Sequence, residues 1–341
     1  DDIDPQRPAC DSDRQRFGTG DSALASAQAY LLNRVDDFVA RLPGSMPLIA
    51  VPTDYKGIDE TPFKRTLAAA LHADVVVQWT GRYGVSVTIS GREAATARQL
   101  YAHPLLVWDN YFANDYIPNL VLGAYEGRDS RLTDSAMGVT VVPMGEPEAS
   151  KIGLFTVADY AWNAAAYDSA RSWEASLREF SRGDAKTLAA LRWFAGANYS
   201  TPLDPLPAPI LSKATATFWT QWAAGDPSAV PTLAQVLRSV RDSTSILRDR
   251  LWDLPFITEA SPWLDGTNLW ARAAIAALDA LDARRKQLPD QATADEQAAR
   301  TLRIQAESVM WPGKTPAIPV QVSGRVLADF VHYGLRGYGP G

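Results

Sequence analysis

Four short apolar runs, separated by segments with helical periodicity, constrain the fold of this chain more than any other feature of its sequence. The runs are residues 47–53, 74–80, 104–110 and 137–143, and each is nearly continuous in aliphatic or β-branched residues. Such runs are typical of strands that are covered on both faces, as in a parallel sheet. The sequence therefore predicts four parallel strands in the first half of the chain.

Helices are predicted beside these strands, at residues 24–42, 62–72, 93–102 and 149–162. The first of them carries an apolar stripe, which predicts contact with the core. The residues of this stripe are Leu24, Ala27, Leu31, Leu32, Val35 and Phe38. Strand and helix in repeated alternation imply right-handed parallel units. Two architectures meet this description, a doubly wound sheet and a TIM barrel.

The residues at the strand ends favour the barrel. No glycine-rich dinucleotide fingerprint and no phosphate-binding loop follows any of the four runs. Instead Tyr55 follows the first run, Thr80 ends the second, and Trp108 and Asn110 end the third. Active sites of TIM barrels are built from such positions, at the C-terminal ends of the strands. Four units make half a barrel, so we expect the other half to lie upstream of Asp1.

The second half of the chain differs in composition and pattern: alanine, leucine and arginine dominate, and apolar residues at helical spacing replace the strand-like runs. Leu233 to Leu247 and Leu269 to Leu281 each carry an apolar helical stripe. Inter-helix loops are predicted at residues 202–209, 227–231 and 288–293. The expected fold class is thus α/β followed by all-α. The expected domains are the second half of a catalytic TIM barrel, a helical domain, and a tail or the start of a further module: residues 1–165, 166–320 and 321–341.

Composition narrows the functional classes. The net charge is −6 and no basic run is present, which argues against nucleic acid as a partner. No apolar stretch reaches the roughly 20 residues that span a bilayer. Cys10 is the only cysteine, so an internal disulfide and a multi-cysteine metal site are excluded. His72, His103 and His332 show no metal-ligand spacing. We therefore expect neither a metal nor a cofactor.

Two polar motifs are candidates for chemistry. Residues 108–116 read WDNYFANDY and begin at a strand end. They gather aromatic rings, amides and carboxylates into one loop, a composition suited to the hydroxyls and ring faces of sugars. Asp1 and Asp2 are adjacent acids at the start of the chain. Alone they are a weak signal, because neighbouring acids on a surface loop are usually solvated charge.

Residues 108–116 resemble the signature of glycoside hydrolase family 84, the O-GlcNAcase and bacterial hyaluronidase-like family. Further matches to this family follow in the same order along the chain: residues 1–3 (DDI), 51–55 (VPTDY), 79–81 (WTG), 122–123 (LG), 127–129 (GRD), 143–144 (PM) and 158–163 (ADYAWN). The resemblance identifies the chain as an N-terminally truncated member, and it implies a TIM-barrel glycosidase that needs no cofactor.

The resemblance also implies a substrate-assisted retaining mechanism, an exception to the usual two-carboxylate scheme. Asp1 would match the aspartate that binds the N–H of the sugar's 2-acetamido group. Asp2 would match the general acid that protonates the leaving oxygen and then acts as a base toward water. Two close carboxylates push their pKa values apart, so one can hold a proton while the other is ionised.

The resemblance assigns substrate contacts as well. Tyr55, Thr80 and Trp108 would shape the acetamido pocket and the anomeric side, while Asn110 and Asp115 would hold the sugar. Two departures from the family pattern stand out. Residue 142 is Val where the family usually has a sugar-binding Asn, and residues 82–83 (RY) follow the WTG motif with an apparent extra residue.

The predicted function is a retaining β-N-acetylglucosaminidase that acts on glycans or glycoproteins containing N-acetylglucosamine (GlcNAc). One alternative is an endo-acting, hyaluronidase-like enzyme. Another is a glycan-binding module with weakened catalysis, motivated by Val142 and the altered loop at residues 82–83. The resemblance is compatible with secretion from a bacterium, but the residues themselves indicate no compartment.

Overall fold

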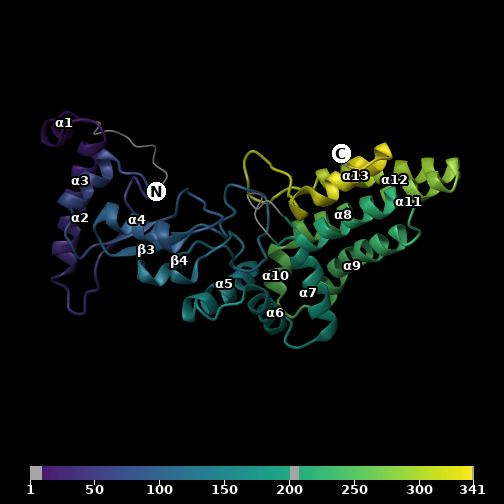
Figure 1. The fold of residues 1–341 in the computed structure, drawn as a ribbon, viewed down its shortest axis with the longest axis horizontal. Coiled ribbons are helices and arrows are strands. Elements are labelled where there is room, and N and C mark those ends of the chain that lie inside the picture. Colours follow the sequence, from purple (N-terminus) through teal and green to yellow (C-terminus); the bar gives the residue numbers. More distant parts are fainter. Residues whose placement is uncertain (1–9, 200–206, 340–341) are drawn as a thin grey trace. The chain divides into compact units, whose positions relative to one another are not determined.

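The computed structural model describes residues 10–199 and 207–339, and the chain divides into two compact units (Figure 1). Unit 1 comprises residues 1–111, 126–142 and 159–167. Unit 2 comprises residues 112–125, 143–158 and 168–341. Unit 1 holds the parallel sheet, and the described part of unit 2 is mainly helical.

Unit 1 is built on a four-stranded parallel sheet with the order β1-β2-β3-β4. The strands are β1 (Ile49–Ala50), β2 (Val76–Trp79), β3 (Leu105–Asp109) and β4 (Val139–Val141). All four predicted strands are confirmed, and each is shorter than its apolar run. Because strand order follows chain order without a reversal, these strands contain no topological switch point of the kind that defines a doubly wound sheet.

Unit 1 contains the helices predicted at residues 24–42, 62–72 and 93–102, together with two short helices that were not predicted, α1 (Asp11–Phe17) and the 3₁₀ helix η1 (Ser130–Asp134). The predicted helices are α2 (Asp21–Val39), α3 (Pro62–Ala70) and α4 (Gly91–Tyr101). The Thr61 hydroxyl caps α3 by accepting the Lys64 N–H at 3.1 Å. A capping box of Ser90 and Glu93 starts α4. Helices α2 and α3 pack together, as do α3 and α4.

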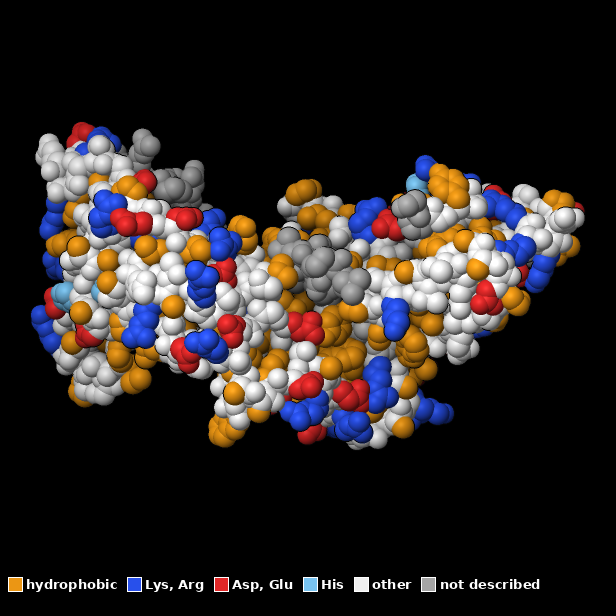
Figure 2. Space-filling view, in the orientation of Figure 1, with side chains coloured by type: hydrophobic (Ala, Val, Ile, Leu, Met, Phe, Trp, Pro, Cys, Tyr) orange, Lys and Arg blue, Asp and Glu red, His pale blue; other side chains and the backbone are white. Residues whose placement is uncertain are grey.

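The predicted apolar stripe of α2 is wrong as a core-facing surface. Leu31, Val35 and Phe38 are 61%, 39% and 64% exposed. The buried residues of this helix are instead Ala23, Ala25 and Ala29. Alanine adds little bulk to a helix surface, so it lets a neighbouring helix come close. The larger side chains of α2 lie at the surface, and Figure 2 shows apolar side chains interspersed with charged ones on unit 1.

Side chains of β3 alternate between the two faces of the sheet. Leu105, Val107 and Asp109 are at most 1% exposed, whereas Leu106 and Trp108 are half-buried. Since the side-chain period of a strand is two residues, Trp108 points away from the side that Asp109 faces. This alternation positions the candidate site described below.

After β4 the chain is mostly helical, as predicted from the helix expected at residues 149–162 and from the helical spacing beyond it. The helices are α5 (Pro147–Trp162), α6 (Ser169–Phe180), α7 (Ala185–Ala197), α8 (Pro209–Ala223), α9 (Ala229–Arg250), α10 (Leu254–Glu259), α11 (Ser261–Arg285), α12 (Pro289–Glu307), η2 (Ser323–Arg325) and α13 (Val326–Arg336). Helix α11 packs against α9, α12 and α13. Its predicted stripe is confirmed, because Leu278 and Leu281 are at most 2% exposed.

Two predicted loops of unit 2 are partly wrong, because residues 229–231 of the loop predicted at 227–231 belong to α9 and most of residues 288–293 belong to α12. Residues 202–206 of the third predicted loop lie outside the described residues. Residues 288–293 contain the start of α12, with Pro289 in the first turn. Proline is well tolerated there, since the first N–H groups of a helix have no partner within it. The predicted tail, residues 321–341, contains α13. Among the described residues, no helix has a long enough apolar stretch to cross a membrane.

Candidate functional site

Thr80 and Tyr55 are joined at the carboxyl ends of β1 and β2. The backbone N–H of Thr80 donates to the carbonyl of Tyr55 at 3.1 Å. The side chain of Thr80 is buried, and its hydroxyl donates to the carbonyl of Tyr83 at 2.8 Å. Tyr55 is half-buried. The structure thus brings these two predicted site residues together, and the Thr80 hydroxyl also holds the loop that follows β2.

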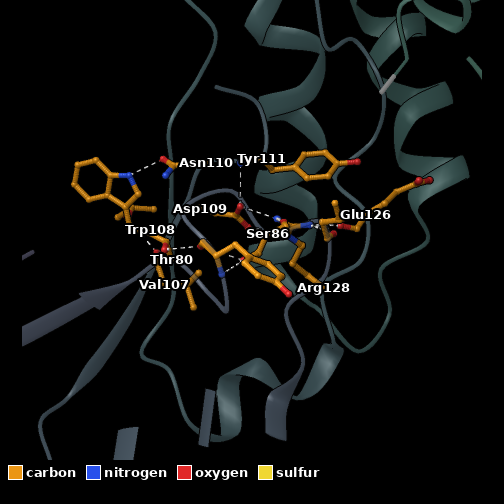
Figure 3. Close-up of polar contacts among 12 residues, drawn as sticks. Thr80, Ser86, Val107, Trp108, Asp109, Asn110, Tyr111, Glu126 and Arg128 are labelled. Carbon is orange, nitrogen blue, oxygen red and sulfur yellow. Dashed lines mark hydrogen bonds and ion pairs between the residues drawn. The ribbon is translucent and has the colours of Figure 1, made fainter. Parts of the chain in front are cut away.

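Trp108 and Asn110 form the second pair, at the end of β3 (Figure 3). The indole Nε1–H of Trp108 donates to Oδ1 of Asn110 at 2.8 Å. Nδ2 of Asn110 donates to the carbonyl of Gly84 at 2.8 Å. An amide side chain carries two N–H donors and two acceptor lone pairs, so these bonds leave one donor and one lone pair for a ligand.

The loop of residues 81–86 links the two pairs. It accepts from Thr80 at Tyr83 and from Asn110 at Gly84. Within the loop, the Tyr83 N–H donates to Oγ of Ser86 at 3.1 Å. Gly81 has φ of +99°, and a Cβ there would lie 2.4 Å from Ser86 Oγ, so this turn requires glycine. The ends of β2 and β3 are therefore held to one loop by side-chain hydrogen bonds.

A buried ion pair that was not predicted from the sequence lies next to this site. Nε and Nη2 of Arg128 donate to Oδ2 and Oδ1 of Asp109 at 2.7 and 2.6 Å. Both side chains are 1% exposed. The other N–H groups of Arg128 donate to the carbonyls of Val87, Glu126 and Ser86. Figure 3 shows this cluster. The five donors of the guanidinium are all used, which offsets the cost of burying its charge.

Two signals in the sequence point to this pair. Asp109 alternates with Trp108 and Asn110 on an apolar strand, so period-two alternation directs it to the buried side. A carboxylate in such a place requires a cationic partner. Arg128 stands in the GRD motif that matched the family pattern. In the structure its guanidinium also lies 4.4 Å from the ring centroid of Tyr111.

Asp115 belongs to unit 2. Asp115 is exposed, and its backbone carbonyl accepts a hydrogen bond from Nζ of Lys314 at 3.2 Å. The preceding Asn114 is fully buried, and its Nδ2 donates to Glu146 Oε2 at 2.6 Å. Nε1 of Trp311 donates to the other carboxylate oxygen of Glu146 at 3.2 Å. The loop that carries Asp115 is therefore anchored within unit 2 by a buried polar network.

The remaining predicted residues are placed as follows. Asp1 and Asp2 lie outside the described residues. Val142 comes directly after β4, is half-buried, and donates its backbone N–H to the Asp109 carbonyl at 2.9 Å. Arg82 is paired through Nε with Oε1 of Glu93 at 3.1 Å.

Two acids near this loop have lowered pKa values. Partial burial favours the neutral form of Glu93, but hydrogen bonds from Ser90 and Arg82 outweigh it and lower the pKa of the carboxyl. Backbone N–H groups of Arg131 and Gly91 lower the pKa of Asp129. Both acids stay ionised and serve as acceptors in the helix starts around the site.

The described site in unit 1 suits binding more than proton transfer. Trp108 and Asn110 offer an aromatic face and an amide, while the buried hydroxyl of Thr80 holds the loop beside them. Asp109, the acid nearest to them in sequence, is held in its pair with Arg128. Such a set of groups can hold a ring with polar substituents, and acid–base chemistry would need acids outside this set.

The comparisons with known proteins agree on one family. Residues 1–196 match the model of the NAGidase family, described as beta-N-acetylglucosaminidase. Protein O-GlcNAcase of Rattus norvegicus is 29% identical over 167 residues, which are 47% of this chain and 17% of that protein. The Mus musculus protein gives the same values. The chain thus spans only a small part of the length of these relatives.

Solved structures give the same picture. A mutant of the Thermobaculum terrenum O-GlcNAc hydrolase superposes with a TM-score of 0.84 at 25% identity, covering 97% of this chain and 68% of that one. CpGH84B superposes with a TM-score of 0.80 at 22% identity, covering 91% of this chain and 55% of that one. Because the identity to CpGH84B is only 22%, that likeness shows the fold alone.

Proposed function

The chain belongs to the β-N-acetylglucosaminidase family, glycoside hydrolase family 84, and we propose that it carries the sugar-binding site of a glycosidase that releases GlcNAc. One observation carries this proposal. Thr80, Trp108 and Asn110 lie at the carboxyl ends of neighbouring parallel strands and are joined through one loop. Ligands of barrel enzymes bind at that end of the strands.

We propose further that the sheet is the second half of a TIM barrel. The sequential parallel order of the strands supports this, as does the packing of successive helices beside each other. Strands β1 and β4 form the edges, and Ile49 in β1 is 52% exposed. Further strands pairing with these edges would close the barrel and remove two open edges that favour aggregation.

The proposed mechanism is substrate-assisted and retaining. The oxygen of the 2-acetamido group forms a bond to the anomeric carbon while the glycosidic C–O bond breaks, giving an oxazoline in its N-protonated, oxazolinium form. Asp2 donates its proton to the leaving oxygen. In the second step Asp2 removes a proton from water, the water oxygen bonds to the anomeric carbon, and the oxazoline opens. Asp1 would hold the acetamido N–H and stabilise its developing positive charge.

The remaining groups would position the sugar. We assign Tyr55, Thr80 and Trp108 to the acetamido group and the anomeric side. Asn110 retains hydrogen-bonding capacity beyond its bonds to Trp108 and Gly84, which supports its assignment to a sugar hydroxyl. Asp115 would bind hydroxyls at the far edge of the ring.

The test is hydrolysis of an aryl β-N-acetylglucosaminide by the full-length protein and by an Asp2→Asn variant. We expect the variant to be slower by about 100-fold or more, the typical effect of losing general acid catalysis. Asp11→Asn, at an exposed acid of α1, is the matched control and should keep full activity. NMR of the first product should show the β-anomer, because the mechanism retains configuration.

Two outcomes would replace this proposal. If the protein binds GlcNAc but turns over no glycoside, it is a glycan-binding module, an alternative that Val142 favours because valine offers no side-chain hydrogen bond to a sugar. If hyaluronan is cut internally and terminal GlcNAc is not released, the enzyme is endo-acting.

A further inference from the structure

Tyr83 is an exposed aromatic residue on the loop that joins the candidate site residues. It is 64% exposed. Single exposed apolar residues are common on protein surfaces and need no function. Tyr83 differs from such residues in the way its backbone is held.

The backbone of Tyr83 is fixed on both of its polar groups. Its carbonyl accepts from Oγ1 of Thr80 at 2.8 Å and from Oγ of Ser86 at 3.2 Å. Its N–H donates to Oγ of Ser86 at 3.1 Å. The next carbonyl, that of Gly84, accepts from Asn110. An exposed ring on so constrained a backbone loses little conformational entropy when a ligand covers it.

The bonds that hold Tyr83 also set its place relative to the proposed sugar site, so this inference rests on the proposed function. Thr80, which bonds its carbonyl directly, is assigned to the acetamido group and the anomeric side. The leaving group is attached to the anomeric carbon. A residue fixed to Thr80 therefore lies near the anomeric end of the proposed sugar site, the end to which the leaving group is attached.

We propose that Tyr83 is a platform for a ring-shaped leaving group, specifically a second sugar linked to the GlcNAc that is released. An aromatic face packs well against the C–H face of a sugar ring. Arg82 lies beside it in sequence, 46% exposed in its side chain and bound through Nε to Glu93. A guanidinium carries five N–H donors, so Arg82 can supply donors to sugar hydroxyls.

The same contacts argue against a peptide as the preferred leaving group. An extended peptide is recognised largely through its main chain, which needs free backbone donors and acceptors on the protein. On this loop the Tyr83 carbonyl accepts from both Thr80 and Ser86 and its N–H donates to Ser86, so Tyr83 has no main-chain group left for a peptide. What the loop presents is a ring face and a guanidinium.

The experiment measures GlcNAc release by the full-length protein from a β-linked GlcNAc disaccharide, from methyl β-N-acetylglucosaminide and from a GlcNAc-modified peptide. In Tyr83→Ala we expect kcat/KM for the disaccharide to fall about 3- to 10-fold, the range expected for one ring contact. The values for the methyl glycoside and the peptide should change less than twofold, an allowance of about 0.4 kcal/mol. Tyr83→Phe keeps the ring and should keep the activity.

The matched control is Tyr30→Ala, which removes another partly exposed tyrosine of unit 1, on α2. It should affect all three substrates equally. Equal losses on all substrates in Tyr83→Ala, or a larger loss on the peptide, would overturn the inference while leaving the proposed function intact.

If the wild-type protein cleaves none of the substrates, the proposed function fails, and calorimetric titration with GlcNAc and with the disaccharide then decides the inference alone. Weaker binding of only the disaccharide in Tyr83→Ala supports a ring platform. Unchanged binding of both sugars overturns it.

Discussion

Arg128 binds both carboxylate oxygens of Asp109, at 2.7 and 2.6 Å, in a pair whose side chains are each 1% exposed. Asp109 stands between Trp108 and Asn110 in the sequence, and strand alternation directs it to the opposite side of the sheet. Its contact with Arg128 therefore fixes the backbone from which the side chains of Trp108 and Asn110 project. We regard the pair as an anchor of the site.

Replacing Asp109 with Asn should test this anchor, because it leaves the charge of Arg128 buried without an ionised partner. Removing one member of a buried pair typically costs about 3–5 kcal/mol. We expect Asp109→Asn to lower the free energy of unfolding of the full-length protein by roughly that amount, measured by urea denaturation. The KM for an aryl β-N-acetylglucosaminide should rise in the same variant.

The control for this prediction is Arg131→Ala. It breaks an ion pair with Asp134 in which the side chains are 79% and 59% exposed. Exposed pairs contribute about 0–1 kcal/mol. If Asp109→Asn and Arg131→Ala proved equally mild, the buried pair would not be an anchor.

Most strand and helix positions in unit 1 were predictable because they depend on local signals, although the short helices α1 and η1 were not predicted. Four apolar runs became four strands, and the box of Ser90 and Glu93 started α4. The packed face of α2 was not predictable in the same way. Its large side chains Leu31 and Phe38 are exposed, whereas small alanines face its neighbour. Periodicity identifies a stripe, but tertiary packing decides which side is covered.

The candidate site, too, was predictable from the sequence only in part. Thr80, Trp108 and Asn110 were predictable as strand-end residues, because parallel strands bring their carboxyl ends together. The link between them through the carbonyls of Tyr83 and Gly84 was not, since those bonds depend on the conformation of the loop. Arg128 is 19 positions from Asp109, and only the fold makes them partners.

The capping box of α4 should contribute measurably to stability. Oγ of Ser90 accepts the Glu93 N–H at 3.2 Å, and Oε2 of Glu93 accepts the Ser90 N–H at 3.0 Å. Ser90→Ala should lower the free energy of unfolding by about 1 kcal/mol. Thr96→Ala, inside the same helix, should cause no loss because alanine is the better helix former. Similar losses in both variants would show that the box adds nothing specific.

His72 should make unit 1 less stable as pH rises. Its Nδ1 lies 2.9 Å from Oδ2 of Asp36, and this hydrogen bond is the largest cause of its raised pKa, with Asp37 and Asp74 adding to it. The folded state therefore favours the protonated ring. The resulting stability is full below the unfolded pKa of about 6.5 and is lost as pH rises through the folded value.

Thermal unfolding between about pH 6 and pH 8.5, a range that brackets the unfolded histidine pKa, checks this prediction. His72→Gln should flatten the decline of Tm relative to the wild type, whereas His332→Gln, at an exposed position of α13, should leave it unchanged. The same slope in wild type and His72→Gln would show that another group sets the pH dependence.

Val142→Asn should strengthen sugar binding if the proposed site is right. Val142 follows β4, and its backbone N–H donates to the carbonyl of Asp109 at 2.9 Å, which fixes it beside the end of β3. An asparagine there would restore the side-chain donor and acceptor that the family usually has. One hydrogen bond contributes about 1 kcal/mol, so the Kd for GlcNAc, measured by calorimetry, should fall about 5-fold.

Val141→Asn is the matched control, because strand alternation turns residue 141 to the other side of the sheet. That variant should gain no affinity, and a gain in both variants or in neither would place the sugar away from the end of β4.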